Sequence, residues 1–479
     1  MKLLDNTINY LESILNERRY TMSEKAEILK IYRLSPLQEG MLFHSIKDLE
    51  RKDYIQQLII TVEGNLNVKA FEETFKELVR RYDIFRTNFI YGITEVPQQV
   101  VLKHRNISIS YVDITNLEQN TKLEYICDFI DCDKKRGFDL SRDILMRIHI
   151  LKYETNIHKI VWSFHHILLD GWSSDILLKE FLDIYSSIDK NIPLNLDKPH
   201  QYIEYINWIK KMDESASETF WKNYLMGYSN KIIIPEKQDF NNGFYKSILN
   251  FMFDDKLKQE LEEVAKRNST TISIILQALW GIILQKYNNQ DDIVFGLVIS
   301  GRNSEIAHVE NILGLFINTI PIRVTIFEGL TFAGLIKSLN ENLIQRSKHE
   351  YYPLAKIQSK MKIKNDLINH VMILHNHVNA FKTQANDEYM KNDLYIKDVE
   401  LYQQTSYNFT LEVLYGNTIE IKVTYNACLY NEDTLQCILN QFESLAKIVV
   451  GNPEIFIDDI NIISKEEEEN LLAAFNEVL

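Results

Sequence analysis

The chain is poor in the residues that mark flexible linkers, disulfide frameworks and membrane spans. Its 479 residues include only 15 glycines and 8 prolines, which argues against long disordered linkers. The four cysteines show no CxxC spacing, so neither a disulfide framework nor a zinc site is predicted. No apolar run approaches the roughly 20 residues that span a bilayer, and no basic segment followed by an apolar core begins the sequence. We therefore expect a cytoplasmic protein without a membrane partner.

The charge balance argues against a further class of partner. The formal net charge is −14, whereas nucleic-acid binding requires a surplus of lysine and arginine. The hydrophobic content of 45% and the charged content of 25% are those of an ordinary globular protein. At this length the chain can bury a large core, and two or three domains are expected.

Helical and strand patterns alternate along the chain, which indicates an α/β or α+β fold with mixed sheets. Asn67 is expected to cap one helix, and Ser35 with Gln38 forms a capping box at the start of another. The apolar run at residues 312–326 predicts a strand pair or one long bent strand. In the first half, strands are predicted at residues 54–62, 107–112, 145–151 and 160–164.

Two lobes of similar makeup are predicted, at residues 26–190 and 191–464. The preceding residues 1–25 carry leucine and isoleucine at helical spacing and form a short amphipathic helix. That helix either packs on its own domain or docks a partner protein, and both interpretations stay open. Residues 465–479 begin as a charged helix.

The stretch VWSFHHILLDGWSSD, residues 161–175, is the strongest candidate for chemistry. An apolar strand ends in His165 and His166, and Asp170 and Gly171 follow in a turn. Ser173 is expected to cap the helix that comes next. A histidine held at the end of a rigid strand can exchange protons near neutral pH.

The residues alone leave the role of this stretch open. Neighbouring residues on a strand point to opposite faces, so at most one of the two histidines faces a given cavity and the other is a core residue. Asp170 either orients a histidine or pairs with a buried arginine. No GxSxG, HExxH or Walker motif occurs. A histidine without a protein nucleophile suggests an enzyme that activates one substrate to attack another.

Several motifs in order then resemble those of one family, the condensation domains of non-ribosomal peptide synthetases, relatives of chloramphenicol acetyltransferase. HHILLDGWS is similar to its HHxxxDG motif, LSPLQEGMLFHS to its first motif, and ILGLFINTIPIR to GxFxNTxxxR. RYDIFRTNF resembles RHExLRTxF, with Tyr82 and Asp83 as departures. YIEYINW resembles the family's YxDYAxW segment, and SGRNSEI looks like its SGR segment. HEYYPLAKI resembles HQDxPFE in weaker form, with Glu350 and Tyr351 where QD is usual. The resemblance covers about residues 31 to 465.

The resemblance implies a fold and an activity. The fold is two chloramphenicol acetyltransferase-like lobes arranged as a V with a central tunnel. The activity is acyl transfer: the α-amine of an acceptor aminoacyl thioester attacks a donor peptidyl thioester and forms a peptide bond, in the biosynthesis of antibiotics and other secondary metabolites. Both substrates arrive on phosphopantetheine arms of peptidyl carrier proteins. No metal or diffusible cofactor is implied.

The resemblance also implies roles for the residues of the motif. His166 faces the tunnel and is the candidate general base, whereas His165 is more structural. Asp170 holds the loop through a salt bridge to an arginine, for which Arg302 is the first candidate and Arg323 and Arg86 the next. Gly171 lets the backbone approach the substrate closely.

Finer features of the motifs predict a subclass and its partners. LSPLQEGMLFHS and FHHILLDGWS look like the subclass whose donor ends in a D-residue and whose acceptor is an L-residue. Such domains often follow a synthetase that ends in an epimerisation domain, which would dock through residues 1–25. Residues 465–479 resemble the start of a linker towards an adenylation domain. The alternatives are a non-catalytic recruitment platform of the same fold and a transferase that makes esters or loads an acyl starter.

Overall fold

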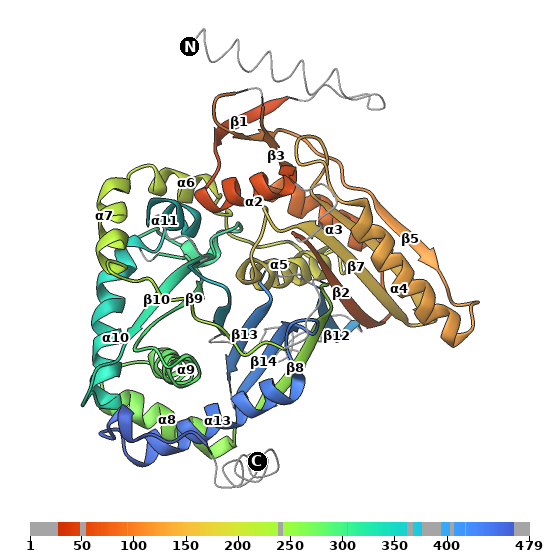
Figure 1. The fold of residues 1–479 in the computed structure, drawn as a ribbon. Helices are drawn as coiled ribbons and strands as arrows, with labels where there is room; N and C mark the ends of the chain where they lie inside the picture. Colours follow the sequence, from red (N-terminus) through yellow and green to blue (C-terminus); the bar gives the residue numbers. More distant parts are fainter. Residues whose placement is uncertain are drawn as a thin grey trace. The chain divides into compact units, whose positions relative to one another are not determined.

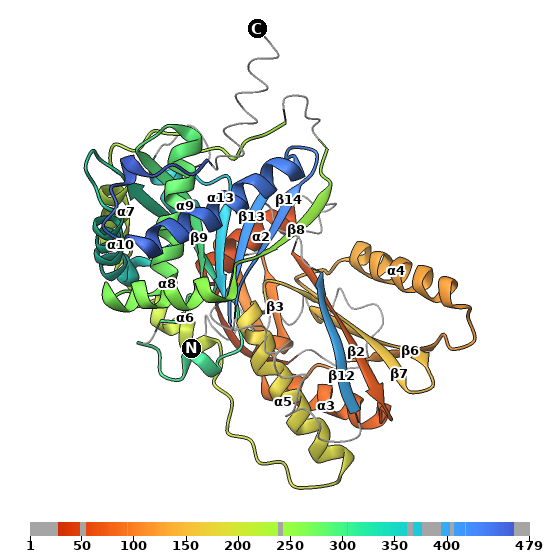
Figure 2. The same cartoon turned by 90° about the horizontal axis from the view of Figure 1, so that it is seen from below.

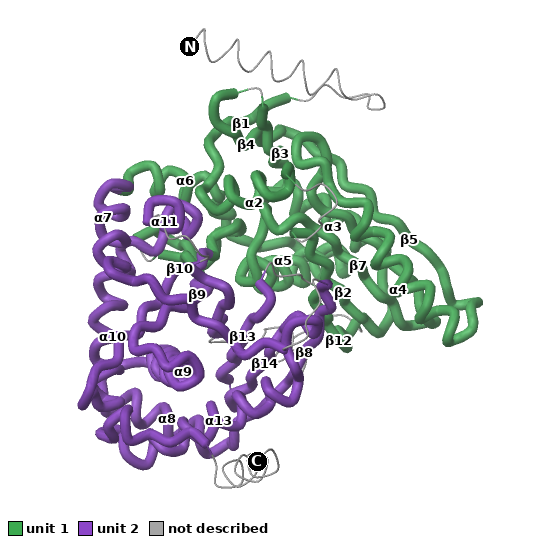
Figure 3. Tube along the Cα trace, in the orientation of Figure 1, with its two compact units in different colours: residues 1–212, 300–317, 379–404 green, residues 213–299, 318–378, 405–479 purple. Residues whose placement is uncertain are grey.

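The computed structural model divides the chain into two compact units, shown in separate colours in Figure 3. Unit 1 comprises residues 1–212, 300–317 and 379–404, and unit 2 comprises residues 213–299, 318–378 and 405–479. The predicted segments 1–25 and 465–479 lie outside the described residues. The structure describes residues 27–47, 54–92, 94–237, 243–303, 305–361, 367–375, 394–402, 407–416 and 418–463.

Unit 1 is built on a five-stranded sheet with the order β12-β2-β7-β6-β5. Its neighbours are antiparallel except for β5 and β6, which run parallel. The strands are β2 (Ile55–Gly64), β5 (Ile109–Asp113), β6 (Met146–Glu154), β7 (Ile157–His165) and β12 (Leu394–Tyr402). A smaller sheet, β1-β4-β3, comprises β1 (Ile28–Arg33), β3 (Thr87–Ile90) and β4 (Gln98–Leu102).

Helices cover both faces of the larger sheet (Figures 1 and 2). Leu58 and Ile60 of β2 join the core beneath α3 (Val68–Arg81) and α5 (Gly171–Asp189). Ile59 points the other way, into a core with α4 (Gln119–Arg136). This alternation is the period-two pattern of a strand buried on both faces, and it accounts for the continuous apolar runs in the sequence.

The helix starts in unit 1 follow the predicted capping chemistry in two cases. The side chain of Asn67 accepts a hydrogen bond from the Ala70 N–H at the start of α3. In α2 (Pro36–Lys47), the Ser35 hydroxyl accepts from the Gln38 N–H at 3.2 Å, and the Gln38 carbonyl oxygen accepts from the Ser35 N–H at 3.0 Å. Both caps are therefore confirmed. A short helix, α6 (Ile203–Ile209), completes the unit.

Unit 2 contains a six-stranded mixed sheet with the order β10-β9-β11-β13-β14-β8. Its strands are β8 (Lys246–Met252), β9 (Asp292–Ile299), β10 (Asn318–Thr325), β11 (Val371–His375), β13 (Phe409–Tyr415) and β14 (Ile419–Asn426). Its helices are α7 (Glu214–Tyr224), α8 (Asp255–Arg267), α9 (Ile272–Asn288), α10 (Phe332–Arg346), α11 (Leu354–Met361) and α13 (Glu432–Gly451). One face of the sheet packs on α8, α9 and α13 (Figure 2), with α9 almost wholly buried.

The units differ from the predicted lobes of residues 26–190 and 191–464. Residues 191–212 and 300–317 belong to unit 1, and β12 pairs along the edge of β2. The run at residues 312–326 contains one strand, β10, because its first half is a buried loop and no strand pair forms. None of the helices that the structure describes has the length and apolarity needed to cross a membrane.

Candidate active site

The histidine stretch lies at the end of β7, between two neighbouring strands. His165 pairs with Ile55 across β2, and its N–H donates to the Leu145 carbonyl at 3.0 Å. The His166 N–H donates to the Tyr54 carbonyl at 2.8 Å. The backbone of both histidines is therefore held from two sides, which is the rigidity that a positioned acid or base requires.

His165 has the environment of a structural residue. Its side chain is buried, and its Nδ1 accepts the Ile167 N–H at 3.1 Å. Its Nε2 lies 3.3 Å from the Ser45 hydroxyl. Since Nδ1 is an acceptor, the ring proton of the neutral imidazole lies on Nε2, and both nitrogens are engaged inside the protein.

Within the described residues, no group is hydrogen-bonded to Nε2 of His166. Its ring is partly buried, and Nδ1 lies 2.6 Å from the Leu169 carbonyl oxygen, to which it donates. The neutral tautomer therefore carries its proton on Nδ1 and leaves the lone pair of Nε2 available. Burial lowers the pKa of His166, against the smaller raising effects of the Leu169 carbonyl and Asp170. The imidazole is neutral near pH 7, the form a general base needs.

Asp170 is completely buried and caps α5. Its Oδ1 accepts hydrogen bonds from the Ser173 N–H at 2.9 Å and the Ser173 hydroxyl at 2.8 Å. Its Oδ2 accepts the Phe316 N–H at 3.0 Å. The expectation that Ser173 caps this helix is wrong, since Asp170 is the cap and Ser173 lies three residues into the first turn.

Arg302 is the cation that lies against Asp170. Its Nη2 is 3.0 Å from Asp170 Oδ1, and its side chain is only 4% exposed. The guanidinium stacks on the Phe316 ring at 4.1 Å, and burial lowers its pKa. The same Nη2 donates to the Ser173 hydroxyl at 3.0 Å. The carboxylate is thus committed to the turn and to this ion pair, and does not orient His166.

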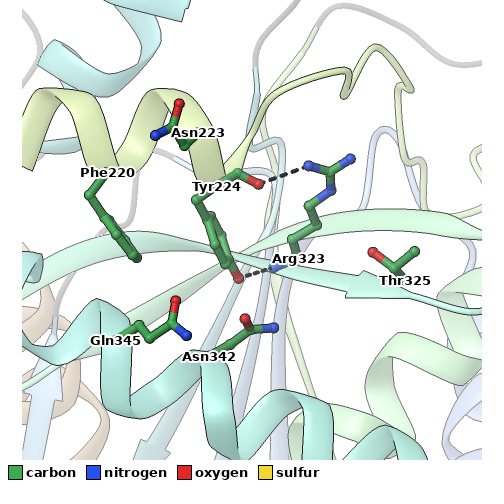
Figure 4. Close-up of a pocket in the computed structure, with 7 residues that line it drawn as sticks. All are labelled: Phe220, Asn223, Tyr224, Arg323, Thr325, Asn342 and Gln345. Atoms are coloured by element: carbon green, nitrogen blue, oxygen red, sulfur yellow. Dashed lines mark hydrogen bonds between the residues drawn. The ribbon is translucent and has the colours of Figure 1, made fainter.

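The other two arginine candidates make ion pairs elsewhere. Arg86 lies 2.7 Å from Asp83, three residues earlier in the chain. Arg323, in unit 2, binds both carboxylate oxygens of Asp292 at 2.8 Å. It also lines a pocket of about 470 Å³ between α7, β10 and α10, where it donates to the Tyr224 carbonyl (Figure 4).

Residues 300–317 complete the site through contacts that the sequence analysis missed. The Gly314 N–H donates to the Ser173 hydroxyl at 3.1 Å, and the Gly314 carbonyl accepts the Asp170 N–H at 3.2 Å. The Tyr202 hydroxyl donates to the Leu315 carbonyl at 2.6 Å. The sequence marked two of the residues that make these contacts, since Ser173 lies in the DGWS motif and Gly314 lies in the ILGLF motif. Hydrogen bonds between segments distant in sequence carry no local pattern.

Gly171 is exposed beside this network, at the first position of α5. A Cβ at residue 171 would meet no atom of the described chain within 4 Å. The fold itself therefore does not require glycine here. The predicted close approach of substrate to this backbone stays a prediction.

Gly314 is the glycine whose replacement should disturb the site. An added Cβ would lie 2.0 Å from Cδ2 of Tyr202, whose ring is fixed edge-on against Phe316. We expect Gly314→Ala to lower the free energy of unfolding by about 1–3 kcal/mol, the usual cost of overpacking. Urea denaturation measures this change.

The matched control is Gly40→Ala in α2, where an added Cβ meets nothing within 4 Å. This variant should be neutral or slightly stabilising, because alanine favours a helix interior by roughly 0.5–1 kcal/mol over glycine. Equal urea midpoints for Gly314→Ala and Gly40→Ala would contradict the tight packing of Tyr202 on Gly314.

Within the described part of the chain, no group of three His, Cys, Asp or Glu side chains is arranged to hold a metal ion. All four cysteines are free thiols.

Comparisons with known proteins identify the family of this chain. The family model described as "Condensation domain" matches residues 28–472, so the chain belongs to the condensation-domain family. Gramicidin S synthase 2 of Brevibacillus brevis is 35% identical over 456 residues, and tyrocidine synthase 2 of Brevibacillus parabrevis is 34% identical over 452 residues. The two alignments cover 95% and 94% of this chain, but only 10% and 12% of those relatives.

Solved structures show the same fold. A four-domain nonribosomal peptide synthetase bound to AMP and glycine superposes with a TM-score of 0.76 at 19% identity, over 95% of this chain and 35% of that chain. The starter condensation domain of the rhizomide synthetase RzmA gives a TM-score of 0.74 at 15% identity, over 91% and 100% of the two chains. The predicted α/β class with mixed sheets is confirmed.

Proposed function

We propose that this chain forms amide bonds between two thioester substrates, each held on the phosphopantetheine arm of a carrier protein. The observation that carries the proposal is the tautomer of His166, whose Nδ1 donates to the Leu169 carbonyl and whose Nε2 has no hydrogen-bond partner among the described residues. Membership of the condensation-domain family supports it, as does the similarity to gramicidin S synthase 2 and tyrocidine synthase 2.

The reaction joins an amine and an acyl group. The acceptor α-amine attacks the donor thioester carbonyl, the C–N bond forms, the C–S bond breaks, and the thiol leaves with a proton. An α-ammonium has a pKa of about 7.7–8.0, so most of it is protonated at neutral pH. Nε2 of neutral His166 accepts the proton that the attacking nitrogen loses and can return it to the leaving sulfur.

The ion pair of Asp170 and Arg302 has a positioning role in this proposal. It fixes the turn that carries the Leu169 carbonyl, and this carbonyl in turn fixes the orientation of the imidazole. Thioesters are already activated, so holding the two reactants in line contributes strongly to the rate. The V-shaped arrangement of lobes with a tunnel, the adenylation-domain neighbour and the docking of an upstream synthetase through residues 1–25 stay predictions.

The finer proposal is a donor that ends in a D-residue and an acceptor that is an L-residue. It rests on the sequences of the first motif and of the HHILLDGWS stretch. The test loads excised carrier proteins with donors ending in D- or L-residues and follows amide formation by mass spectrometry. We expect faster turnover of the D-terminated donor. Equal turnover would overturn the subclass, and no amide from either donor would overturn the proposed function.

The pH dependence provides an independent test of His166. The rate advantage of the wild type over His166→Gln should be constant at pH values where His166 is neutral, and should disappear as pH falls through its pKa. Burial lowers this pKa, so the loss should occur below about 6.5, the value of a free histidine.

The measurement is the ratio of the two rates between about pH 8 and pH 5, within the titration range of histidine. Ionisation of the acceptor amine cancels in this ratio, because both enzymes use the same substrate. If this ratio already decreases at pH values above the pKa of free histidine, the assignment of His166 as the general base is contradicted.

A further inference from the structure

A pocket of about 470 Å³ lies wholly within unit 2, between α7, the edge strand β10 and α10 (Figure 4). This volume falls within the range of roughly 300–1,000 Å³ that small-molecule sites occupy. The rings of Phe220 and Tyr224 extend from α7 towards two carboxamides on α10 (Figure 4). The residues that line the pocket are Phe220, Asn223, Tyr224, Arg323, Thr325, Asn342 and Gln345.

Arg323 holds two walls of the pocket together. Its Nε and Nη2 donate to the two carboxylate oxygens of Asp292 at 2.8 Å. Its Nη1 donates to the Tyr224 and Met226 carbonyls at 2.8 and 3.0 Å, and its backbone N–H donates to the Tyr224 hydroxyl at 2.8 Å. The end of α7 is therefore fastened to β10, and the pocket is formed before a ligand arrives.

The charges at the pocket are compensated within unit 2. Among the described residues that line it, Arg323 is the charged one, and the Asp292 carboxylate cancels that charge. Arg346, the residue after Gln345, is buried and pairs with Glu350 at 3.5 Å. An ion that entered would give up its hydration without meeting a counter-charge, which is costly. The pocket therefore favours a neutral ligand over an anion or a cation.

The polar groups of the pocket can both donate and accept hydrogen bonds. Asn342 and Gln345 lie three residues apart, on one face of α10, whereas Asn223 is on α7 and Thr325 is on β10. A carboxamide offers an oxygen acceptor and two N–H donors, and a hydroxyl offers one donor and two lone pairs. The ligand that matches these groups carries groups of the same dual character, such as hydroxyls or amides.

The edge of β10 distinguishes between a peptide and a hydroxylated compound. An extended peptide binds a sheet edge through main-chain hydrogen bonds. Pro321 has no N–H, and the Arg323 N–H is already bound to the Tyr224 hydroxyl, so this edge cannot pair with a further strand here. Phe220 and Tyr224, stacked at 5.8 Å, offer an apolar wall to the C–H groups of a compact ligand. A hydroxylated ring compound therefore fits the pocket better than a peptide.

We propose that this pocket binds a neutral, polyhydroxylated small molecule of about the size of a monosaccharide. Its hydroxyl groups exchange hydrogen bonds with the carboxamides of Asn342 and Gln345, and its C–H groups pack on the two rings of α7. This inference is independent of the proposed amide-forming activity. The pocket belongs to unit 2, whereas His166 and its partners belong to unit 1, and no step of the proposed reaction uses the pocket.

The probe is methyl α-D-glucopyranoside, whose binding is followed by saturation-transfer NMR of the sugar protons. The wild type should bind it saturably. Asn342→Leu and Gln345→Leu should each raise the dissociation constant by about 2- to 10-fold, because each removes a hydrogen bond between neutral groups. Gln436→Leu is the matched control and should leave the constant unchanged, since this carboxamide lies on α13, outside the pocket, and is bonded to Asn440.

Two competitors separate the classes of ligand. N-acetylglycine methylamide represents a peptide and inorganic phosphate represents an anion, and neither should displace the glucoside at equal concentration. Displacement by either one would overturn the assignment to a polyhydroxylated ligand. Absence of saturable binding, or equal binding by the wild type and both pocket variants, would overturn the inference altogether. Weaker binding that occurs only in variants with a lowered urea midpoint would be a folding defect and would overturn it as well.

Discussion

Replacing His166 with alanine should lower the rate of amide formation by about 10²–10⁴-fold, the usual contribution of general-base catalysis. The variant loses the nitrogen that receives the proton of the attacking amine. It also loses the hydrogen bond between Nδ1 and the Leu169 carbonyl, which contributes roughly 0.5–1.5 kcal/mol to stability, so the protein stays folded. The measurement is single-turnover amide formation with both carriers loaded and saturating.

A second variant separates base catalysis from positioning. His166→Gln keeps a polar side chain that can hydrogen-bond but cannot accept a proton near pH 7. We expect it to be nearly as slow as alanine if His166 is a base. A glutamine variant close to the wild-type rate would show that His166 positions the substrate, and a wild-type rate in both variants would refute any role in the reaction.

His165→Ala is the control from the adjacent position. Both ring nitrogens of His165 contact groups of unit 1, the Ile167 N–H and the Ser45 hydroxyl. Its replacement should lower the urea midpoint more than that of His166→Ala. The rate of the protein that remains folded should fall less. The opposite pattern would exchange the roles that we assign to the two histidines.

The sequence was most informative where local chemistry determines local structure. The capping box of Ser35 and Gln38 and the cap at Asn67 involve residues three apart, and both form as predicted. The helix α4 was not predicted, because its buried positions include Lys122 and Asp133 and its apolar stripe is incomplete. The loop before β10 has the apolar composition of a strand, but it is buried without pairing to any strand that the structure describes.

In the candidate site, too, local motifs could be predicted from the sequence, whereas contacts between distant segments could not. The motif located His166 and Asp170, and the resemblance placed Arg302 first among three arginines, but the contact that distinguishes Arg302 joins segments distant in sequence. Arg86 has an aspartate within one turn and Arg323 has one on the neighbouring strand, so neither is available to Asp170. Residues 300–317 bring Arg302 into unit 1, across the boundary that the sequence had suggested between the lobes.

Replacing Arg302 with methionine should destabilise the protein by about 3–5 kcal/mol, because it leaves a buried carboxylate without its cation. Asp170 is completely buried, and its remaining donors are Ser173 and the Phe316 N–H. The stacking of the guanidinium on Phe316 is lost as well. Arg80→Met is the surface control, because Arg80 forms an ion pair with Glu77 while its side chain is 74% exposed. This substitution should lower the free energy of unfolding by no more than about 1 kcal/mol. Urea denaturation of both variants gives the comparison.

A double-mutant cycle decides whether the cost arises from the unpaired charge. Asp170→Asn keeps a side chain that can cap α5 and removes the negative charge. With the charge gone, Arg302→Met should cost less than it does alone, and the coupling should be about 0.5–3 kcal/mol. Additive losses would mean that Arg302 acts through its packing on Phe316 rather than through Asp170. If the coupling is found and folded Asp170→Asn also keeps a rate far above that of His166→Ala, Asp170 stabilises the turn and is not a relay for the proton.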